Sequence, residues 1–369
     1  MTTATLPRLQ ANRGRTVAQA WVASRGLIML VALLLTITRD QEFARVVSQW
    51  DVEHFTDLAV GGYLYRADGT LMAFFPGLPM LLRFGLWVGL PVAVTGVILA
   101  ALGSAAAAAA LLRLGGPWAA VAWLFAPTAV FTLVPYTEAL FCAAAFWAWE
   151  RARADRWAAA ALLAAAACTL RVSGLFLVGA LFVLVLTTRP RMWRRALWLL
   201  LPVGMIAAFV LYLYGLTGSW TAWYTAQAAG WEREFTLPWE SFWHTYDSAQ
   251  PDAFPDWPLW WPVFAAEIVS MAVGVLVVGW CLGRRLWAEA SWVGIQVLAF
   301  SVSYWFFSVN RAILLWFPLW MMIGELVSWR PERPAARVAH RIVVAAGFVA
   351  SALLMLAWSW LYFTGNWAS

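Results

Sequence analysis

Apolar segments of about 20 residues recur along almost the whole chain, and this pattern constrains the fold more than any other feature. A helix of that length crosses the hydrocarbon core of a bilayer. Only 12% of the 369 residues are charged, whereas soluble domains carry about 25%. We therefore predict an all-α polytopic membrane protein that forms one integral membrane domain over residues 1–369. About eleven spans are expected, at 17–37, 92–112, 117–134, 136–150, 157–170, 173–188, 196–215, 260–282, 290–308, 312–328 and 341–363.

Three parts of this pattern are less regular. The stretch 71–90 is interrupted by Pro76, Pro79 and Arg83, so it is a weaker candidate span. The pair around 157–188 has short halves, and a re-entrant pair is an alternative there. The basic N-terminus precedes an apolar run that no clear cleavage site follows, so a first span is predicted rather than a signal peptide.

Arginine is retained in short cytoplasmic loops, and this predicts the orientation. With the N-terminus inside, most acids fall outside, while the basic loops all fall on the cytoplasmic side. Of the 25 basic residues, all of them Arg, 17 are then inside: Arg8, Arg13, Arg15, Arg113, Arg151, Arg153, Arg156, Arg189, Arg191, Arg194, Arg195, Arg284, Arg285, Arg330, Arg333, Arg337 and Arg341.

Two predicted outside segments, 39–91 and 216–259, are too long to be simple connections. Both are rich in aromatic residues, and amphipathic aromatic side chains lie at the headgroup level of a bilayer. We expect these external loops to carry interfacial helices. A few of the tryptophans are candidates for stacking on sugar rings, while the rest form ordinary interfacial belts.

Several classes of function find no support. The arginines do not gather on a soluble face, so no nucleic-acid partner is expected, and no nucleotide-binding loop is present. The cysteines Cys142, Cys168 and Cys281 lie singly in apolar stretches, which is untypical of disulfide or zinc sites. No cofactor and no His–Cys metal site are predicted. Binding of one divalent metal ion by the loop carboxylates stays an alternative.

The segment 49–63 carries the clearest chemical signal. At helical spacing Asp51, His54 and Phe55 share one face, and Glu53 and Asp57 share another. A carboxylate at the start of an interfacial helix, on an external loop, is suited to general-base catalysis on a hydroxyl nucleophile. The alternative is that Asp51 only caps the helix.

The same segment resembles the PIG-V type of GPI mannosyltransferase, a family with many bacterial members. The resemblance rests on patterns that occur in the family's order from about residue 50 to 318. They are Trp-Asp-x-x-His-Phe at 50–55 with Gly62-Tyr63, Ala-Phe-Phe-Pro-Gly-Leu-Pro at 73–79, Pro-Tyr-Thr-Glu at 135–138, Arg-Val-Ser-Gly at 171–174, Asn310-Arg311 and Phe317-Pro318.

The resemblance implies a GT-C-like helical bundle whose first external loop carries the catalytic acid. It implies a mannosyltransferase that uses a polyprenyl-phosphate-mannose donor and a lipid or glycan acceptor, in the cell membrane, with an extracytoplasmic active site. Intramembrane arginines are costly and tend to be functional, and a guanidinium fork suits a phosphate; snorkelling to headgroups is the alternative. Asp51 is then the predicted base, and the predicted substrate-binding residues are Trp50, His54, Glu138, Arg171 and Arg311.

Two other functions stay open at this point. A transporter or lipid flippase would place polar sites at the bilayer midplane, often between internal repeats. Here the two halves show no evident repeat, and the acids lie in loops. A non-catalytic subunit of an envelope-assembly complex is the third possibility, and such a subunit would not need Asp51.

Overall fold

The computed structural model describes residues 5–188 and 193–368, with side chains from Asn12 onward. Arg189, Arg191 and the Arg8 side chain, all assigned to the inside, lie outside this part. The described residues form helices, with one isolated bridge between Phe235 and Ser303. The α-helices and 3-10 helices (η) are α1 Thr5–Thr38, α2 Phe43–Val47, α3 Asp51–Gly61, η1 Thr70–Ala73, α4 Gly77–Trp87, α5 Val92–Leu124, η2 Ala129–Thr132, α6 Glu138–Arg153, α7 Trp157–Cys168, α8 Ser173–Thr187, η3 Trp193–Leu199, α9 Leu200–Thr217, α10 Ala222–Trp231, α11 Pro238–Ser248, α12 Trp260–Gly283, α13 Trp287–Ser301, α14 Val309–Ala312, η4 Ile313–Leu315, α15 Phe317–Ser328 and α16 Pro334–Phe363.

The predicted multi-pass membrane protein is confirmed. Among the described residues, five helices are long and apolar enough to cross a membrane, or six if one bent pair counts as a single span. The pair at 157–188 consists of the shorter apolar helices α7 and α8. The weak candidate at 71–90 contains only the 11-residue helix α4. The number of eleven spans stays a prediction.

The predicted spans 92–112 and 117–134 meet at a break inside α5. Gly116 has a φ of 81°, in the left-handed region, and Pro117 follows it. The helix then continues only to Leu124, and the rest of the second predicted span is an irregular segment with the short helix η2. Pro127 and Pro135 explain this difference, because neither offers a backbone N–H to a continuing helix.

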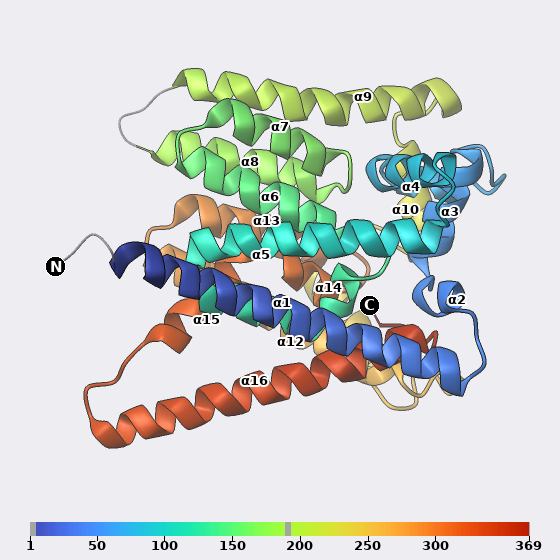
Figure 1. Cartoon of the computed structure of the whole chain (residues 1–369). Coiled ribbons are helices and arrows are strands. Elements are labelled where there is room, and N and C mark those ends of the chain that lie inside the picture. The colour runs from blue at the N-terminus through green and yellow to red at the C-terminus, as the bar shows by residue number, and fades with distance from the viewer. Residues whose placement is uncertain (1–4, 189–192, 369) are drawn as a thin grey trace.

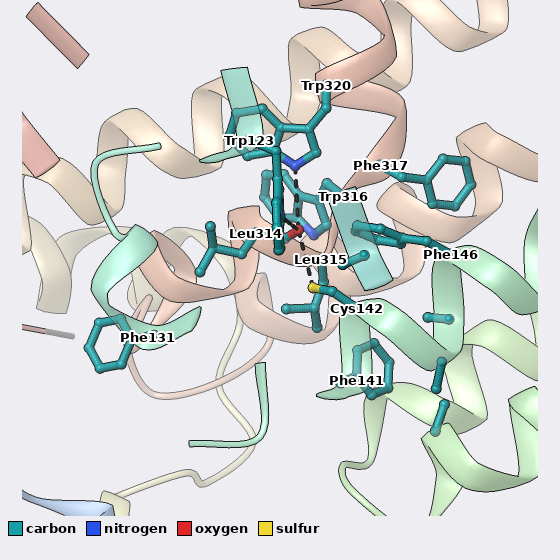
Figure 2. Close-up of a cluster of buried hydrophobic side chains, with 14 of the residues drawn as sticks. Trp123, Phe131, Phe141, Cys142, Phe146, Leu314, Leu315, Trp316, Phe317 and Trp320 are labelled. Atoms are coloured by element: carbon teal, nitrogen blue, oxygen red, sulfur yellow. Dashed lines mark hydrogen bonds between the residues drawn. The ribbon is translucent and has the colours of Figure 1, made fainter. Parts of the chain in front are cut away.

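A second break separates η4 from α15, where the axes of 309–315 and 317–328 differ by 71°. The break leaves the carbonyls of Leu314 and Leu315 outside a regular helix. Trp123 donates its indole N–H to the Leu314 carbonyl at 2.9 Å, and Trp292 donates to that of Leu315 at 3.1 Å. Figure 2 shows Trp123, Trp320 and Cys142 around the carbonyl of Leu314. The break is tolerated within an apolar bundle because buried side chains satisfy the freed backbone groups.

The long helices lie side by side, and the short helices α2, α3, α4 and α10 gather at one end of the bundle (Figure 1). Both expected external loops are therefore helical. They also touch, because Trp223 and Gln227 of α10 each donate a hydrogen bond of 3.1 Å to the carbonyl of Ala73. The two long loops thus form one layer over that end.

The other end of the bundle carries a second group of arginines. α6 runs from Glu138 to Arg153, and its 16 residues separate the two ends by about 24 Å. Ion pairs at the far end join Arg153 with Glu289 at 3.6 Å, and Arg195 with Asp155 at 2.8 Å. The described part of the chain thus has Arg153 and Arg195, two of the arginines predicted to be inside, at the end opposite to Asp51. The orientation in the membrane stays a prediction.

Candidate active site

Four charged side chains from distant parts of the sequence form one network at the end covered by the short helices. Arg311 donates a hydrogen bond of 3.0 Å to Oδ2 of Asp51. Its Nε lies 3.1 Å from Oε1 of Glu138, and Arg171 binds the same carboxylate oxygen. Asp51, Glu138, Arg171 and Arg311, each predicted separately, are thus brought together.

Asp51 is the first residue of α3, and the fold fixes it from both sides. The preceding Trp50 is the N-cap, with a φ of 56° that is unusual for a bulky residue. The backbone N–H of Asp51 donates to the hydroxyl of Tyr136 at 3.2 Å, and that hydroxyl donates to the carbonyl of Gln49 at 3.3 Å. The N-cap position of α3 is thus occupied by Trp50, whose side chain makes no cap hydrogen bond. The carboxylate of Asp51, one residue later, binds Arg311.

Glu138 lies behind the arginines rather than in a cavity. Its side chain is fully buried, at 0% exposure, and it lines neither of the two cavities that Asp51 borders. Arg171 also donates to the hydroxyl of Thr137 at 3.0 Å. A buried carboxylate shared by two guanidinium groups fixes both of them and offsets their charge. This geometry makes Glu138 a positioning residue, and its predicted contact with substrate stays a prediction.

The turn that carries Arg311 is held by a residue that the sequence reading did not single out. Glu267 of α12 is buried, and its two carboxylate oxygens accept the backbone N–H groups of Ser308 at 3.0 Å and Asn310 at 2.6 Å. Ser308 has a φ of 70°, so this turn is strained. The side chain of Asn310 is also fully bound, by Ser270 at 2.7 Å and by the carbonyl of Val263 at 3.0 Å. In the sequence, the only sign of this role is that Glu267 is a charged residue inside an apolar span, where charged residues tend to be functional.

A small polar cavity of about 100 Å³ opens beside the network. Three guanidinium groups, those of Arg171, Arg233 and Arg311, line it together with the carboxylate of Asp51. Arg233 was not predicted. Burial and the neighbouring Arg311 and Arg171 lower the pKa of Arg233 to about 10, so it stays protonated at neutral pH. The cavity presents a concentrated positive charge.

A larger cavity of about 450 Å³ lies on the other side of Asp51. It contains both remaining predicted residues, Trp50 and His54, and it shares Asp51, Tyr136, Trp231 and Arg311 with the small cavity. The His54 ring stacks on Phe74 with 5.0 Å between centroids. Burial lowers the pKa of His54 below its usual 6.5, against the nearby charge of Asp51, and leaves the imidazole neutral at pH 7.

A third cavity, of about 410 Å³, is mainly apolar and lies beside the small one. Its lining includes Pro76 and Thr169, which are the sequence neighbours of Phe75 and Leu170 in the small cavity. It also includes Leu58, which lies one helical turn after Phe55 of the small cavity. Its far wall is formed by Met205, Phe209 and Tyr212 of α9. An apolar cavity thus lies between α9 and residues adjacent to the lining of the small cavity.

The described residues contain no group of three or more His, Cys, Asp or Glu side chains placed to hold a metal ion. The three cysteines are free and buried among apolar neighbours. The carboxylates of Glu53 and Asp57 are both bound by Arg66. Glu53 and Arg66 also line the larger cavity with Asp51 and His54, so the two predicted faces of α3 are not separated there.

No protein-family model matches the chain. It is similar to GPI alpha-1,6-mannosyltransferase 2 of Rattus norvegicus, with 35% identity over 152 residues that cover 36% of this chain and 30% of the relative. The same enzyme of Cricetulus griseus is 36% identical over the same coverage, and that of Homo sapiens is 33% identical. The matched region spans about a third of the length of these curated relatives.

Among solved structures, the fold is similar to that of ArnT from Cupriavidus metallidurans bound to undecaprenyl phosphate. The TM-score is 0.51 at 15% sequence identity, and the match covers 93% of this chain and 70% of ArnT. This likeness confirms the predicted GT-C-like helical bundle. The chain thus has the GT-C fold of ArnT and, over about a third of its length, the sequence similarity to PIG-V type GPI mannosyltransferases that its motifs predict.

Proposed function

We propose that this protein is a membrane glycosyltransferase that transfers mannose from a polyprenyl-phosphate-mannose donor to a lipid or glycan acceptor on the extracytoplasmic side. The observation that carries the proposal is the position of Asp51. Its carboxylate is held by Arg311 on the boundary between a cationic cavity and a larger cavity. The similarity to GPI alpha-1,6-mannosyltransferase 2 supports the choice of mannose.

The chemistry follows from the two oxygens of Asp51. Oδ2 accepts from Arg311, while Oδ1 has no hydrogen-bond partner among the described residues. Oδ1 is therefore able to take the proton of an acceptor hydroxyl. That hydroxyl oxygen forms a bond to the anomeric carbon as the bond from this carbon to the phosphate oxygen breaks. Polyprenyl phosphate leaves with the electron pair, and a single displacement inverts the anomeric centre.

The arginines supply the electrostatic part of the reaction. Arg171, Arg233 and Arg311 surround a cavity of about 100 Å³, which suits a phosphate group. Negative charge on the leaving phosphate grows as the sugar departs, and preorganised cations stabilise that charge. The burial of Arg311, whose side chain is 10% exposed, strengthens this interaction because water is largely excluded. Snorkelling to headgroups does not account for side chains bound to a buried carboxylate.

A lipid-linked donor also needs a place for its isoprenoid chain. The apolar cavity beside the arginines, walled by α9, supplies one. The helix α9 has exposed Leu200, Leu201 and Leu211, so its outer face suits contact with lipid. ArnT, which has the same fold, was solved with undecaprenyl phosphate bound. The donor would thus enter from the bilayer with its phosphate leading.

The decisive experiment uses the purified protein in nanodiscs with radiolabelled polyprenyl-phosphate-mannose and extracted envelope lipids. We expect mannose transfer by the parent and a loss of about 10²–10⁴-fold in Asp51→Asn, which keeps the shape but accepts no proton. Asp57→Asn is the matched control, because Asp57 lies on the other face of α3 and binds Arg66. Its activity should stay within a few fold of the parent.

An Asp51→Asn variant as active as the parent would overturn the assignment of the base. The same protein in closed vesicles gives the transport measurement. Movement of the donor across the vesicle membrane without any transfer of sugar would favour the transporter instead. Normal transfer by Asp51→Asn together with an inactive Asp57→Asn would move the reaction to the other face of α3.

A further inference from the structure

The residues just before Asp51 lie outside any helix, and side chains from other parts of the chain hold their backbone. Helix α2 ends at Val47 and α3 begins at Asp51, so residues 48–50 connect the two helices. Within this connection Trp50 has a φ of 56°. Such a conformation is costly for a bulky residue and persists only where the surroundings fix it. The position of the Asp51 carboxylate therefore depends on the groups that hold this connection.

Two tyrosine hydroxyls hold Gln49, the residue at the centre of the connection. The hydroxyl of Tyr136 donates to the carbonyl of Gln49 at 3.3 Å, and the hydroxyl of Tyr362 accepts its backbone N–H at 3.3 Å. Tyr362 in turn donates to the carbonyl of Val47 at 3.1 Å. The two tyrosine rings pack edge to face, with 5.8 Å between their centroids. Both backbone polar groups of Gln49 are thus bound by tyrosines.

Tyr362 is remote from the predicted motifs and from the space open to a substrate. It belongs to α16, which runs from the opposite end of the bundle toward α2 and α3 (Figure 1). Its side chain is fully buried, at 0% exposure, and it lines neither of the two cavities that Asp51 borders. An effect of Tyr362 on the reaction must therefore pass through the residues that its hydroxyl binds.

The turn that follows α16 adds a second contact with the same connection. Nε1 of Trp50 donates to the carbonyl of Asn366 at 3.2 Å. The next residue, Trp367, stacks on Phe307 with 4.8 Å between the ring centroids. Phe307 directly precedes the turn at 308–311, which carries the arginine that binds the proposed base. The end of α16 thus contacts the neighbours of both members of this pair.

We propose that Tyr362 and the turn after it are positioning elements of the reaction, which hold the start of α3 so that the carboxylate of Asp51 stays against Arg311. This inference rests on the proposed function and adds the end of α16 to the residues on which transfer depends. The hydroxyl of Tyr362 is the central part, because it binds a backbone N–H and a carbonyl of the connection at once.

Tyr362→Phe keeps the ring and removes only this hydroxyl. The N–H of Gln49 and the carbonyl of Val47 then lose a buried partner, so the start of α3 loosens. We expect kcat for mannose transfer to fall about tenfold to 10²-fold, because a displacement of about 1 Å at a reacting group costs up to that much. The KM of the donor and the Kd of undecaprenyl phosphate should stay within about twofold, since an interaction needed only in the transition state changes kcat alone.

Ser359→Ala is the matched control for the loss of a buried hydroxyl at this end of α16. Ser359 lies one helical turn before Tyr362, is also fully buried, and binds the carbonyl of Met355 within its own helix at 2.7 Å. Its replacement removes a hydrogen bond that has no part in the connection before α3. We expect the kcat of Ser359→Ala to equal that of the parent.

The turn after α16 is tested separately at Gly365. This residue has a φ of 75°, at which a side chain is strained, and an added Cβ would meet Oε1 of Gln49 at 3.4 Å. Gly365→Ala should therefore lower kcat as Tyr362→Phe does. Gly89→Ala is its control, because Gly89 has a φ of 83° but no atom lies within 4 Å of an added Cβ. The strain is similar there, and kcat should be unchanged.

Two further measurements separate positioning from a loss of stability. In the Asp51→Asn background Tyr362→Phe should cause no further loss of kcat, because residues that act through one another are not additive. Hydrogen–deuterium exchange of the peptide covering residues 47–53, measured in nanodiscs, should be about tenfold faster in Tyr362→Phe than in the parent. The same peptide should exchange at the parent's rate in Ser359→Ala.

A parental kcat in Tyr362→Phe would overturn the inference and leave the proposed function standing. An equal loss in the parent and in the Asp51→Asn background would also overturn it, because Tyr362 would then only stabilise the fold. A raised Kd of undecaprenyl phosphate with an unchanged kcat would overturn it by placing the effect at the phosphate. Faster exchange at residues 47–53, with no mannose transfer by the parent, would contradict the proposed function and still support the hold of Tyr362 on the start of α3.

Discussion

Arg311 and Asp51 are 260 residues apart in sequence, and their side chains are joined by a hydrogen bond of 3.0 Å. The contact links α14, which lies just before the helix break, to the start of α3. Arg311 also stacks over the ring of Tyr136, with its guanidinium carbon 5.2 Å from the ring centroid. One cation therefore touches the proposed base, the buried Glu138 and the cavity proposed for phosphate, so its replacement tests all three relations.

We predict that Arg311→Ala raises the Kd of undecaprenyl phosphate by roughly ten- to 150-fold. This range corresponds to about 1.5–3 kcal/mol for a hydrogen bond to a charged group. Arg311→Lys should recover only part of the affinity, because lysine keeps the charge but loses the planar fork. Equilibrium binding in nanodiscs measures both values.

Arg66→Ala is the control for Arg311, since Arg66 lines the large cavity and not the small one. It should leave the affinity for undecaprenyl phosphate unchanged. Unaltered affinity in both Arg311 variants would mean that Arg311 only balances the charge of Asp51 and Glu138.

Much of the site was predictable because its residues stand out against an apolar background. An aspartate that follows Trp50, a glutamate at the start of a span and arginines at span ends are all conspicuous where charge is rare. Their mutual pairing was not predictable, because a contact between positions 51 and 311 depends on the packing of every helix between them. Glu138 shows the consequence, since its binding of both Arg171 and Arg311 could not be read from the sequence.

The missed residues share a different cause. Arg233 belongs to a loop rich in charged residues, where one arginine gives no signal. The packing of α10 against η1 brings this loop to the cavity of Arg171 and Arg311. The break at 313–317 was also missed, because Ile313, Leu314 and Leu315 are as apolar as any regular span. The indole donors that make this break possible lie on other helices.

The proposed orientation predicts opposite labelling of the two ends of the bundle. Ala154→Cys lies at the end of α6 that is predicted to be cytoplasmic, and Asp247→Cys lies in α11, which is predicted to be external; both positions are exposed. An impermeant thiol reagent on intact cells should label the cysteine at 247 and not the one at 154. The native Cys142, Cys168 and Cys281 are buried, so they give little background. The reverse pattern would place the active site in the cytoplasm.

We predict that His54 makes the folded protein less stable in mild acid. Burial lowers the pKa of His54 below 6.5, and the charge of Arg66 lowers it further. The charges of Asp51, Glu53 and Asp57 raise the pKa, but burial is the largest effect. Protons then bind more readily to the unfolded chain, so stability is full above about pH 6.5 and falls as the pH drops through the lowered pKa. His54→Asn should flatten the fall in Tm between about pH 6.5 and 5 in detergent. An identical fall in the variant would assign the pH dependence to other groups.

Glu267→Gln should weaken donor binding through Arg311 without touching the donor. The carboxylate accepts two backbone N–H groups, those of Ser308 and Asn310, whereas the glutamine amide offers one acceptor oxygen and sets an N–H donor against the other. A buried N–H left without an acceptor costs about 1–3 kcal/mol, so Tm should fall, the turn at 308–311 should loosen and the Kd of undecaprenyl phosphate should rise about tenfold. The rise should vanish when Arg311 is already alanine, because residues that act through one another are not additive.

Glu289→Gln is the matched control, a buried carboxylate at the far end of the bundle that pairs with Arg153 at 3.6 Å. It should lower Tm and leave donor affinity alone. Equal weakening by Glu267→Gln in the parent and in the Arg311→Ala background would show that Glu267 stabilises the fold without positioning Arg311.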